Sequence, residues 1–385
     1  MNRKKIAVIF GTRPDTIKQA PVILELQRHP EYFDVVTIAT AQHRQMLDQV
    51  LEVFKIKPDY DLDIMAPKQT LASLTAKIIT GIDEILEKEK PDMVLVQGDT
   101  STTCIGSLAA FYRQIPVGHV EAGLRTDDKM NPFPEEINRR ITGCITDLHF
   151  APTKTAKDSL LKENVDPKTI FVTGNTVVDA LEYSVKENYE FTVPVLTEVV
   201  NQNKKIVLVT MHRRENWGKP MEGAARAIKR LAQQYPDFAF VFPVHMNPIV
   251  RDAVIPILKD MPNVKLIEPL DYLDFVNIMA KSYLILTDSG GVQEEGPHFG
   301  IPILCLRYVT ERPDAVNFGT VKLVGLEEET IYNTALKLIE DENEYKKMAN
   351  AVNPYGDGLS SDRTVKIIKN YFGLANEEII EFDPR

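Results

Sequence analysis

The chain has 385 residues, which allows about two domains at the usual size of roughly 100–200 residues per domain. Hydrophobic residues make up 44% of it and charged residues 26%, a globular composition that excludes disordered and collagen-like classes. The formal net charge of −10 argues against overall attraction to nucleic acid or to an anionic membrane, although a local basic cleft could still bind phosphate.

Cysteine usage and hydropathy bear on where the protein works. None of the cysteines belongs to a CxxC pair, and they lie far apart, at Cys104, Cys144 and Cys305, which argues against a disulfide framework or a structural zinc site. The apolar run Ile6–Phe10 is too short for a signal peptide and is predicted to be a first strand. No apolar stretch approaches the roughly 18 residues that span a bilayer. We therefore expect a soluble, cytoplasmic protein.

Short apolar runs alternate with longer amphipathic stretches along the chain. This alternation is typical of parallel sheets covered by helices on both faces. In the first half, strands are expected at Ile6–Phe10, Val35–Thr40, Met93–Val96 and Leu148–Phe150, and a helix at Leu71–Lys88. In the second half, strands are expected at Ile206–Val209, Phe238–Phe242, Tyr283–Leu286, Ile303–Leu306 and Val321–Val324, and helices at Met221–Gln234 and Glu328–Asp341.

The pattern indicates two domains. About a dozen strands are too many for one comfortable doubly wound sheet. A strand–helix series runs to about residue 175, a polar stretch follows near Glu187–Lys205, and a new strand begins at Ile206. The predicted fold is α/β, with two Rossmann-like doubly wound domains facing a cleft.

Polar residues follow the predicted strands, where ligands bind in open α/β sheets. The stretch Asp288–Glu295 combines Ser, two glycines and Glu residues, which suits a phosphate-binding helix start but also an ordinary capped turn. Arg312, after the next strand, would add a cation. Arg13 follows the first strand and could fork onto a phosphate or form a surface ion pair. His212–Arg214 places three potential cations at one strand end, which a bound diphosphate would stabilise.

Three carboxylates, Asp99, Glu121 and Glu135, closely follow strands of the first half. Carboxylates in such places can have raised pKa values and serve as acid or base, and helix capping is the alternative for Glu135. The DxD pattern at Asp59–Asp63 resembles the metal-binding pattern of glycosyltransferases, but it does not follow a clearly predicted strand, which argues against a metal site. The sequence has no GxGxxG, P-loop or HExxH motif. We therefore predict no bound metal and no cofactor.

Motifs that run from about residue 5 to residue 373 point together to one family. They are Phe10–Pro14 with Ile17 and Lys18, Gln42–Arg44, Gly98–Thr100, His119–Thr126, Pro134–Glu136, Thr173–Thr176, His212–Asn216, Pro243–His245, Glu268–Leu270, Thr287–Glu295, Thr310–Pro313 and Asn353–Gly358. This set resembles the non-hydrolysing UDP-N-acetylglucosamine 2-epimerases of bacteria and archaea.

The resemblance implies a glycosyltransferase-B-like fold whose C-terminal helix crosses back onto the first domain. The expected domains are therefore residues 1–175 plus a C-terminal helix at about 360–385, and residues 176–359. It also implies a homodimer that interconverts UDP-GlcNAc and UDP-ManNAc, which supplies N-acetylmannosamine for cell-surface polysaccharides. No nucleic-acid or membrane partner is expected.

The chemistry of such a reaction constrains the residues needed. The C2 hydrogen of the sugar is not next to a carbonyl, so direct deprotonation is implausible, and the fingerprint for transient oxidation by NAD is missing. Elimination of UDP across C1–C2 to 2-acetamidoglucal, followed by re-addition, needs an acid and a base near C2. It also needs cations that stabilise the leaving diphosphate.

The resemblance assigns roles residue by residue. The catalytic set is Asp99, Glu121, Glu135, His212 and Lys18. The substrate-binding set is Arg13, Phe275, Ser289, Gly290, Gly291, Glu295 and Arg312. In some bacterial members a second UDP-GlcNAc binds beside the active site and activates the enzyme. The residues that match that allosteric site are Gln42, Gln45, Arg213 and His245, and Lys68 occupies a further position of it.

Some positions depart from the family pattern. Asp15 replaces the usual Glu, Gln19 replaces an apolar Met, and Lys68 replaces an Arg of the allosteric pattern without its bidentate fork. Three alternatives remain open on the sequence alone. They are a glycosyltransferase of the same fold, a hydrolysing epimerase that releases free sugar and UDP, and a catalytically silent sensor of nucleotide sugars.

Overall fold

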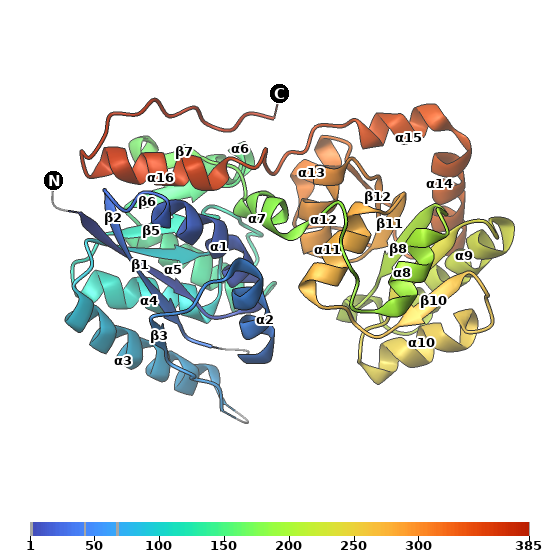
Figure 1. Cartoon of the computed structure of the whole chain (residues 1–385), viewed down its shortest axis with the longest axis horizontal. Coiled ribbons are helices and arrows are strands. Elements are labelled where there is room, and N and C mark those ends of the chain that lie inside the picture. The colour runs from blue at the N-terminus through green and yellow to red at the C-terminus, as the bar shows by residue number, and fades with distance from the viewer. Residues whose placement is uncertain (1–2, 42–43, 67–68, 385) are drawn as a thin grey trace. The chain divides into compact units, whose positions relative to one another are not determined.

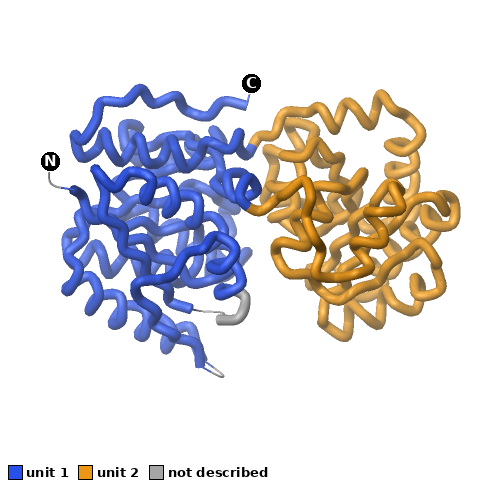
Figure 2. Tube along the Cα trace, viewed as in Figure 1, with its two compact units in different colours: residues 1–183, 355–384 blue, residues 184–354, 385 orange. Residues whose placement is uncertain are grey.

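The chain forms two compact units, each built around one sheet (Figures 1 and 2). The computed structural model describes residues 3–41, 44–66 and 69–384. Unit 1 comprises Met1–Tyr183 and Tyr355–Pro384, and unit 2 comprises Ser184–Pro354.

The sheet of unit 1 has seven strands in the order β3-β2-β1-β4-β5-β6-β7, and all neighbours are parallel. The chain winds outward from β1 in one direction and then from β4 in the other, so β1 and β4 form a topological switch point. The strands are β1 (Lys4–Phe10), β2 (Phe33–Ala39), β3 (Tyr60–Asp61), β4 (Met93–Gln97), β5 (Val117–Val120), β6 (Leu148–Ala151) and β7 (Ile170–Val172).

Helices flank this sheet (Figure 1). They are α1 (Arg13–Gln27), α2 (Arg44–Phe54), α3 (Leu71–Glu89), α4 (Ser101–Tyr112), α5 (Glu135–Ile145), α6 (Lys154–Lys162), α7 (Thr176–Ser184) and α16 (Ser360–Tyr371), with the 3₁₀ turn Pro167–Thr169. Helix α4 packs against α3 and α5, while α1 packs against α2 and α16. The C-terminal helix therefore completes unit 1, beside the first helix of the chain.

The sheet of unit 2 has six parallel strands in the order β10-β9-β8-β11-β12-β13, with a switch point between β8 and β11. The strands are β8 (Ile206–Thr210), β9 (Ala239–Pro243), β10 (Val264–Ile267), β11 (Leu284–Thr287), β12 (Ile303–Cys305) and β13 (Val321–Leu323). The helices are α8 (Pro194–Asn201), α9 (Lys219–Gln234), α10 (Pro248–Leu258), α11 (Tyr272–Ala280), α12 (Gly290–Glu295), α13 (Pro313–Asn317), α14 (Glu328–Glu340) and α15 (Glu342–Ala349), with the 3₁₀ turns Arg214–Asn216 and Gly296–Phe299.

The two parallel, doubly wound sheets confirm the predicted α/β fold class. The compact units divide after Tyr183 and after Pro354, whereas the sequence pattern places these divisions after residues 175 and 359. The difference has a physical cause, because α7 and the chain before α16 are tied to each other. The Asn175 amide donates to the Tyr355 carbonyl at 2.6 Å, and the Asp179 carboxylate accepts from the amides of Ser360 and Ser361.

Apolar residues of the strands and inward helix faces form the core of each unit. In unit 2, Phe240 and Phe242 on β9 are fully buried, and Ile228 and Leu231 on α9 pack in the same cluster. Each buried side chain of this size stabilises the fold by about 1.5–3 kcal/mol relative to its exposed state. Within the described ranges, no helix is both long and apolar enough to cross a membrane.

Gln19 on α1 is a polar residue in an apolar place. It is fully buried, and neither atom of its amide has a hydrogen-bond partner among the described residues. A buried polar group without a partner costs about 1–3 kcal/mol, and Met has nearly the same shape without that cost. We expect Gln19→Met to raise the free energy of unfolding by about 1–3 kcal/mol, measured by thermal or urea denaturation followed by circular dichroism.

Gln27 at the end of the same helix is exposed and provides the matched control. Gln27→Met should change stability by less than about 0.5 kcal/mol. Equal effects of the two substitutions would show that helix propensity, and not the buried amide, is responsible.

Candidate active site

The first candidate residues lie at the switch point of unit 1. Strands β1 and β4 pair there, and α1 begins at Arg13 directly after β1. Gly11 lets this turn pack closely against Thr40, because a Cβ at position 11 would lie 2.0 Å from Thr40 Oγ1. The half-buried Arg13 and the buried Lys18 both lie on α1, at the carboxyl end of the sheet, where the sequence places them.

Asp15, the departure noted in the first motif, fixes the start of α1. Its carboxylate accepts hydrogen bonds from the amides of Gly11 at 3.1 Å and Thr12 at 2.7 Å. Burial raises the pKa of Asp15 to about 6, against the opposing effect of these hydrogen bonds. The shorter Asp side chain therefore closes a capping box, which positions the helix that carries Arg13 and Lys18.

Glu121 is the centre of a buried polar cluster after β5. Its carboxylate forms an ion pair with Lys18. It also accepts hydrogen bonds from the side-chain amides of Gln97 and of Asn175, the latter at 3.1 Å. Glu121 has φ = +63°, a left-handed conformation that is uncommon outside glycine and marks a strained, positioned residue. Two members of the predicted catalytic set, Lys18 and Glu121, thus lie together, and the side-chain amides of Gln97 and Asn175 hold Glu121 in place.

The other two predicted carboxylates, Asp99 and Glu135, lie on the segments that follow β4 and β5. Asp99 follows β4 and pairs with Arg139 of α5. Glu121 Oε2 lies 3.3 Å from where a Cβ on Gly98, the residue before Asp99, would be. Glu135 is the first residue of α5, and its Oε2 is buried without a hydrogen-bond partner in the described part of the chain. Asp99 and Glu121 therefore follow the neighbouring strands β4 and β5, and Glu135 begins α5, the helix whose Arg139 pairs with Asp99.

His212 lies at the switch point of unit 2. Its Nδ1 lies 3.0 Å from Asp288 Oδ1, and the other Asp288 oxygen accepts from the amides of His212 and Arg213, each at 3.0 Å, and from Asn216 Nδ2 at 2.9 Å. Burial acts to raise the pKa of Asp288, but the hydrogen bonds and charge of His212 outweigh it and lower that pKa. The imidazole is thereby oriented with Nδ1 toward Asp288 and Nε2 away from it.

The turn after β11 carries the predicted phosphate-binding residues. Ser289 precedes α12, and Gly290 and Gly291 are its first two residues. Because α12 has only six residues, its macrodipole is small, and its free backbone N–H groups would contribute more to phosphate binding. Arg213 Nη2 lies 3.6 Å from where a Cβ on Gly290 would be, so a cation adjoins this turn, as a diphosphate site requires.

The remaining substrate-binding candidates lie on neighbouring elements of unit 2. Arg312 follows β12 and forms an ion pair with the buried Glu294 of α12. Glu295 is the last residue of α12, and Phe275 is half-buried on α11. These residues belong to the same unit as His212, but no contact given by the structure joins Phe275 to the others.

Part of the predicted allosteric set is described. Arg213 lies 3.9 Å from Glu311, and the His245 ring stacks on His212 with centroids 6.2 Å apart. Burial acts to raise the pKa of Glu311, but Arg307 outweighs it and lowers that pKa to about 2. Gln42 and Lys68 lie outside the described residues, and Gln45 lies on α2 with its side chain outside them.

The structure adds residues to which the sequence assigned no role. Asp288 orients His212, Arg139 holds Asp99, and Gln97 with Asn175 holds Glu121. Asp288 and Asn175 lie in motifs found in the sequence, but neither was given a role of its own, although Asp288 directly follows a buried strand. The only sequence feature that pointed to Arg139 is weaker: it lies three residues after Glu136, so both are expected on one face of a helix.

Two parallel sheets with polar residues at both switch points define a two-domain α/β protein of the glycosyltransferase-B-like class. A solved glycosyltransferase from Rickettsia africae shares this fold with a TM-score of 0.61 at 14% identity, covering 97% of this chain and 100% of its own. The family profile of UDP-N-acetylglucosamine 2-epimerase matches residues 24–369. The chain belongs to that family.

Close relatives share nearly the whole chain. The UDP-N-acetylglucosamine 2-epimerase of Bacillus subtilis is 55% identical over 378 residues, which cover 98% of each chain. The solved structure of the Neisseria meningitidis UDP-GlcNAc 2-epimerase bound to UDP-GlcNAc is 50% identical with a TM-score of 0.86, covering 95% of this chain and 100% of that one.

Proposed function

We propose that the protein catalyses the reversible epimerisation of UDP-GlcNAc to UDP-ManNAc at C2, without hydrolysis. Family membership over nearly the full chain supports this activity. The observation that carries it is that three carboxylates, Asp99, Glu121 and Glu135, lie on the segments that follow the neighbouring strands β4 and β5 in a member of this family. A protein that only binds or senses a nucleotide sugar needs no such set of acid/base groups.

The reaction is proposed to proceed by elimination and re-addition. A carboxylate removes the C2 proton, the C2–H electron pair forms the C1–C2 double bond of 2-acetamidoglucal, and the C1–O pair leaves with UDP. UDP then adds back at C1 while C2 receives a proton on the opposite face. No net oxidation occurs, so the proposal involves no redox cofactor.

The proposed roles follow from the chemistry of each group. Asp99, Glu121 and Glu135 exchange protons at C2, and Lys18 neutralises charge beside Glu121. His212, oriented by Asp288, donates to the leaving diphosphate. The proposed UDP-binding set is Arg13, Phe275, Ser289, Gly290, Gly291, Glu295 and Arg312.

The proposal extends to regulation and assembly. A second UDP-GlcNAc is proposed to activate the enzyme through Gln42, Gln45, Lys68, Arg213 and His245. A homodimer is proposed as well, and the exposed apolar residues Phe111 and Tyr112 at the end of α4 are candidates for its contact. The three free cysteines suit a reducing cytoplasm, where the product would supply N-acetylmannosamine for cell-surface polysaccharides.

The test is to incubate the purified protein separately with UDP-GlcNAc and with UDP-ManNAc, adding a trace of UDP-GlcNAc in the second case, and to follow the sugars by NMR. Both reactions are expected to reach the same mixture of the two nucleotide sugars without NAD or an acceptor. Free sugar plus UDP would instead indicate hydrolysis, product only with an acceptor would indicate a transferase, and binding without turnover would indicate a sensor.

A further inference from the structure

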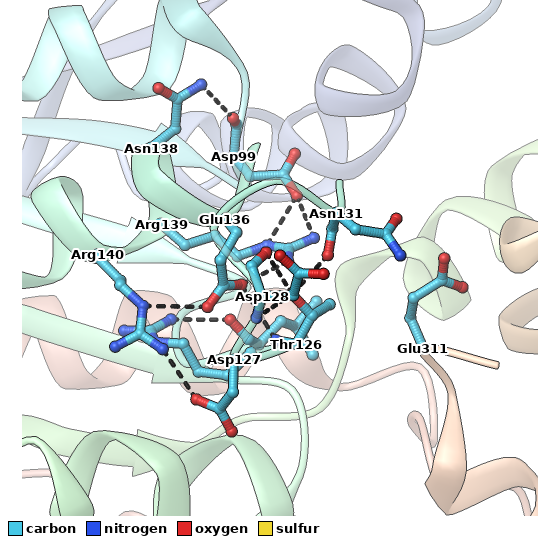
Figure 3. Close-up of polar contacts among 12 residues, drawn as sticks. Asp99, Thr126, Asp127, Asp128, Asn131, Glu136, Asn138, Arg139, Arg140 and Glu311 are labelled. Atoms are coloured by element: carbon cyan, nitrogen blue, oxygen red, sulfur yellow. Dashed lines mark hydrogen bonds and ion pairs between the residues drawn. The ribbon is translucent and has the colours of Figure 1, made fainter. Parts of the chain in front are cut away.

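Arg139 binds only one of the two carboxylate oxygens of Asp99 in the described part of the chain. Arg139 Nε at 2.9 Å and Nη2 at 2.6 Å both reach the same oxygen, Asp99 Oδ2 (Figure 3). Asn138 Nδ2 donates to the Asp99 carbonyl at 2.8 Å and fixes the backbone. In the described part of the chain, the structure gives Oδ1 no hydrogen-bond partner, and the side chain is 28% exposed. One oxygen is therefore anchored, and the other is open to exchange a proton.

Arg139 is itself held by a buried carboxylate. Glu136 is fully buried, and its Oε2 accepts from Arg139 Nη1 at 3.1 Å and from the Thr126 amide at 3.1 Å. Its Oε1 accepts from Arg140 Nε at 3.1 Å. Because a guanidinium is planar and forked, bonding at Nη1 fixes the direction in which Nε and Nη2 point.

We propose that Arg139, oriented by Glu136, is a positioning residue that anchors Asp99 Oδ2 and so presents Oδ1 as the proton-exchanging atom. This inference rests on the proposed epimerase function, in which Asp99 acts at C2. Arg139 does not touch the substrate in this account and acts only through Asp99. Its removal should therefore affect the chemical step more than substrate binding.

Arg140 provides a matched comparison on the same helix. It also bonds to Glu136, and its other partners are Asp127 at 2.8 Å and Glu163 at 3.1 Å. Neither partner is a proposed acid or base. Arg139→Gln and Arg140→Gln thus remove the same group from the same buried carboxylate, but only the first removes the anchor of Asp99.

The experiment measures kcat and KM for UDP-GlcNAc in the full-length wild type, R139Q, R139K and R140Q, with thermal melting to verify folding. We expect R139Q to lower kcat on the order of 100-fold with KM changed less than about 3-fold, and R140Q to stay within about 3-fold in both. R139K keeps the charge but lacks the planar fork of the guanidinium, so its kcat should recover part of the loss. E136Q in the R139Q background should add no further loss of kcat, because Glu136 acts through Arg139.

The results distinguish a failure of the Arg139 proposal from a failure of the proposed epimerase function. Equal losses in R139Q and R140Q, in an active wild type, would overturn the inference and leave the proposed function standing. The same holds if R139Q acts on KM alone, or if R139Q fails to fold and the folded R139K keeps full kcat. A wild type that does not epimerise UDP-GlcNAc would overturn both.

Discussion

Asp99→Asn is expected to lower turnover of UDP-GlcNAc by about 10²–10⁴-fold, the range that a positioned acid or base contributes. Asparagine keeps the size of the side chain and can still accept from Arg139 through its amide oxygen. It cannot take up a proton at the atom that Asp99 leaves open. The affinity for UDP should stay largely unchanged, because the proposed UDP-binding residues belong mostly to unit 2. Steady-state kinetics and calorimetric titration with UDP measure the two quantities.

The control makes the same chemical change at a half-buried position on the surface helix α6. Asp158 pairs with Lys154, four residues earlier, and Asp158→Asn should leave kcat and KM unaltered. Near-normal turnover in Asp99→Asn would sink the assignment of Asp99 as a proton-exchanging group. Loss of UDP binding in that variant would show that its effect is structural.

Asp288→Ala is expected to destabilise unit 2 by about 3 kcal/mol, because it leaves buried Asn216 and two half-buried backbone amides without their acceptor. Asp288 is fully buried, and its carboxylate accepts from two backbone amides, from Asn216 and from the His212 ring. Trp217, the single tryptophan of the chain, directly follows Asn216 and packs against the core of unit 2. Urea denaturation followed by tryptophan fluorescence therefore reports on this unit.

Asp341→Ala is the matched control in the same unit. The Asp341 side chain caps α15 by accepting from the amides of Asn343 and Glu344, at a half-buried position. Its loss should cost about 1 kcal/mol, the usual effect of removing a helix cap. If Asp288→Ala costs no more than this control, the Asp288 cluster does not stabilise the turn after β8.

The sequence predicts the fold well where hydrophobic periodicity is strong. The runs Ile6–Phe10 and Ile206–Val209 became β1 and β8, and Leu71–Lys88 became α3 to within one residue. Periodicity does not mark β3, which has two residues, or β10, whose Lys265 interrupts its apolar run. The unit boundaries depend on which segments pack together, as Asp179 with Ser360 and Ser361 shows, and no local pattern encodes that choice.

The residues of the candidate site also differ in how far the sequence predicts them. Asp99, Glu121 and His212 could be singled out because polar residues after buried strands gather at the edge of a parallel sheet. The pairings themselves could not be predicted, since Arg139 and Asn175 are distant in sequence from Asp99 and Glu121 and meet them only through the tertiary fold. The buried amide of Gln19 shows the converse, an unusual residue that is visible in the sequence but whose cost depends on burial.

The central claim is that the C2 proton is removed and replaced during a reversible reaction. The most direct measurement incubates the protein with UDP-GlcNAc in D₂O, without NAD or an acceptor, and follows the sugar by proton NMR. The account predicts UDP-ManNAc with deuterium at C2, together with loss of the C2 proton signal from the UDP-GlcNAc pool as the reaction reverses. UDP-ManNAc that keeps its original proton at C2, or no conversion at all, would contradict it.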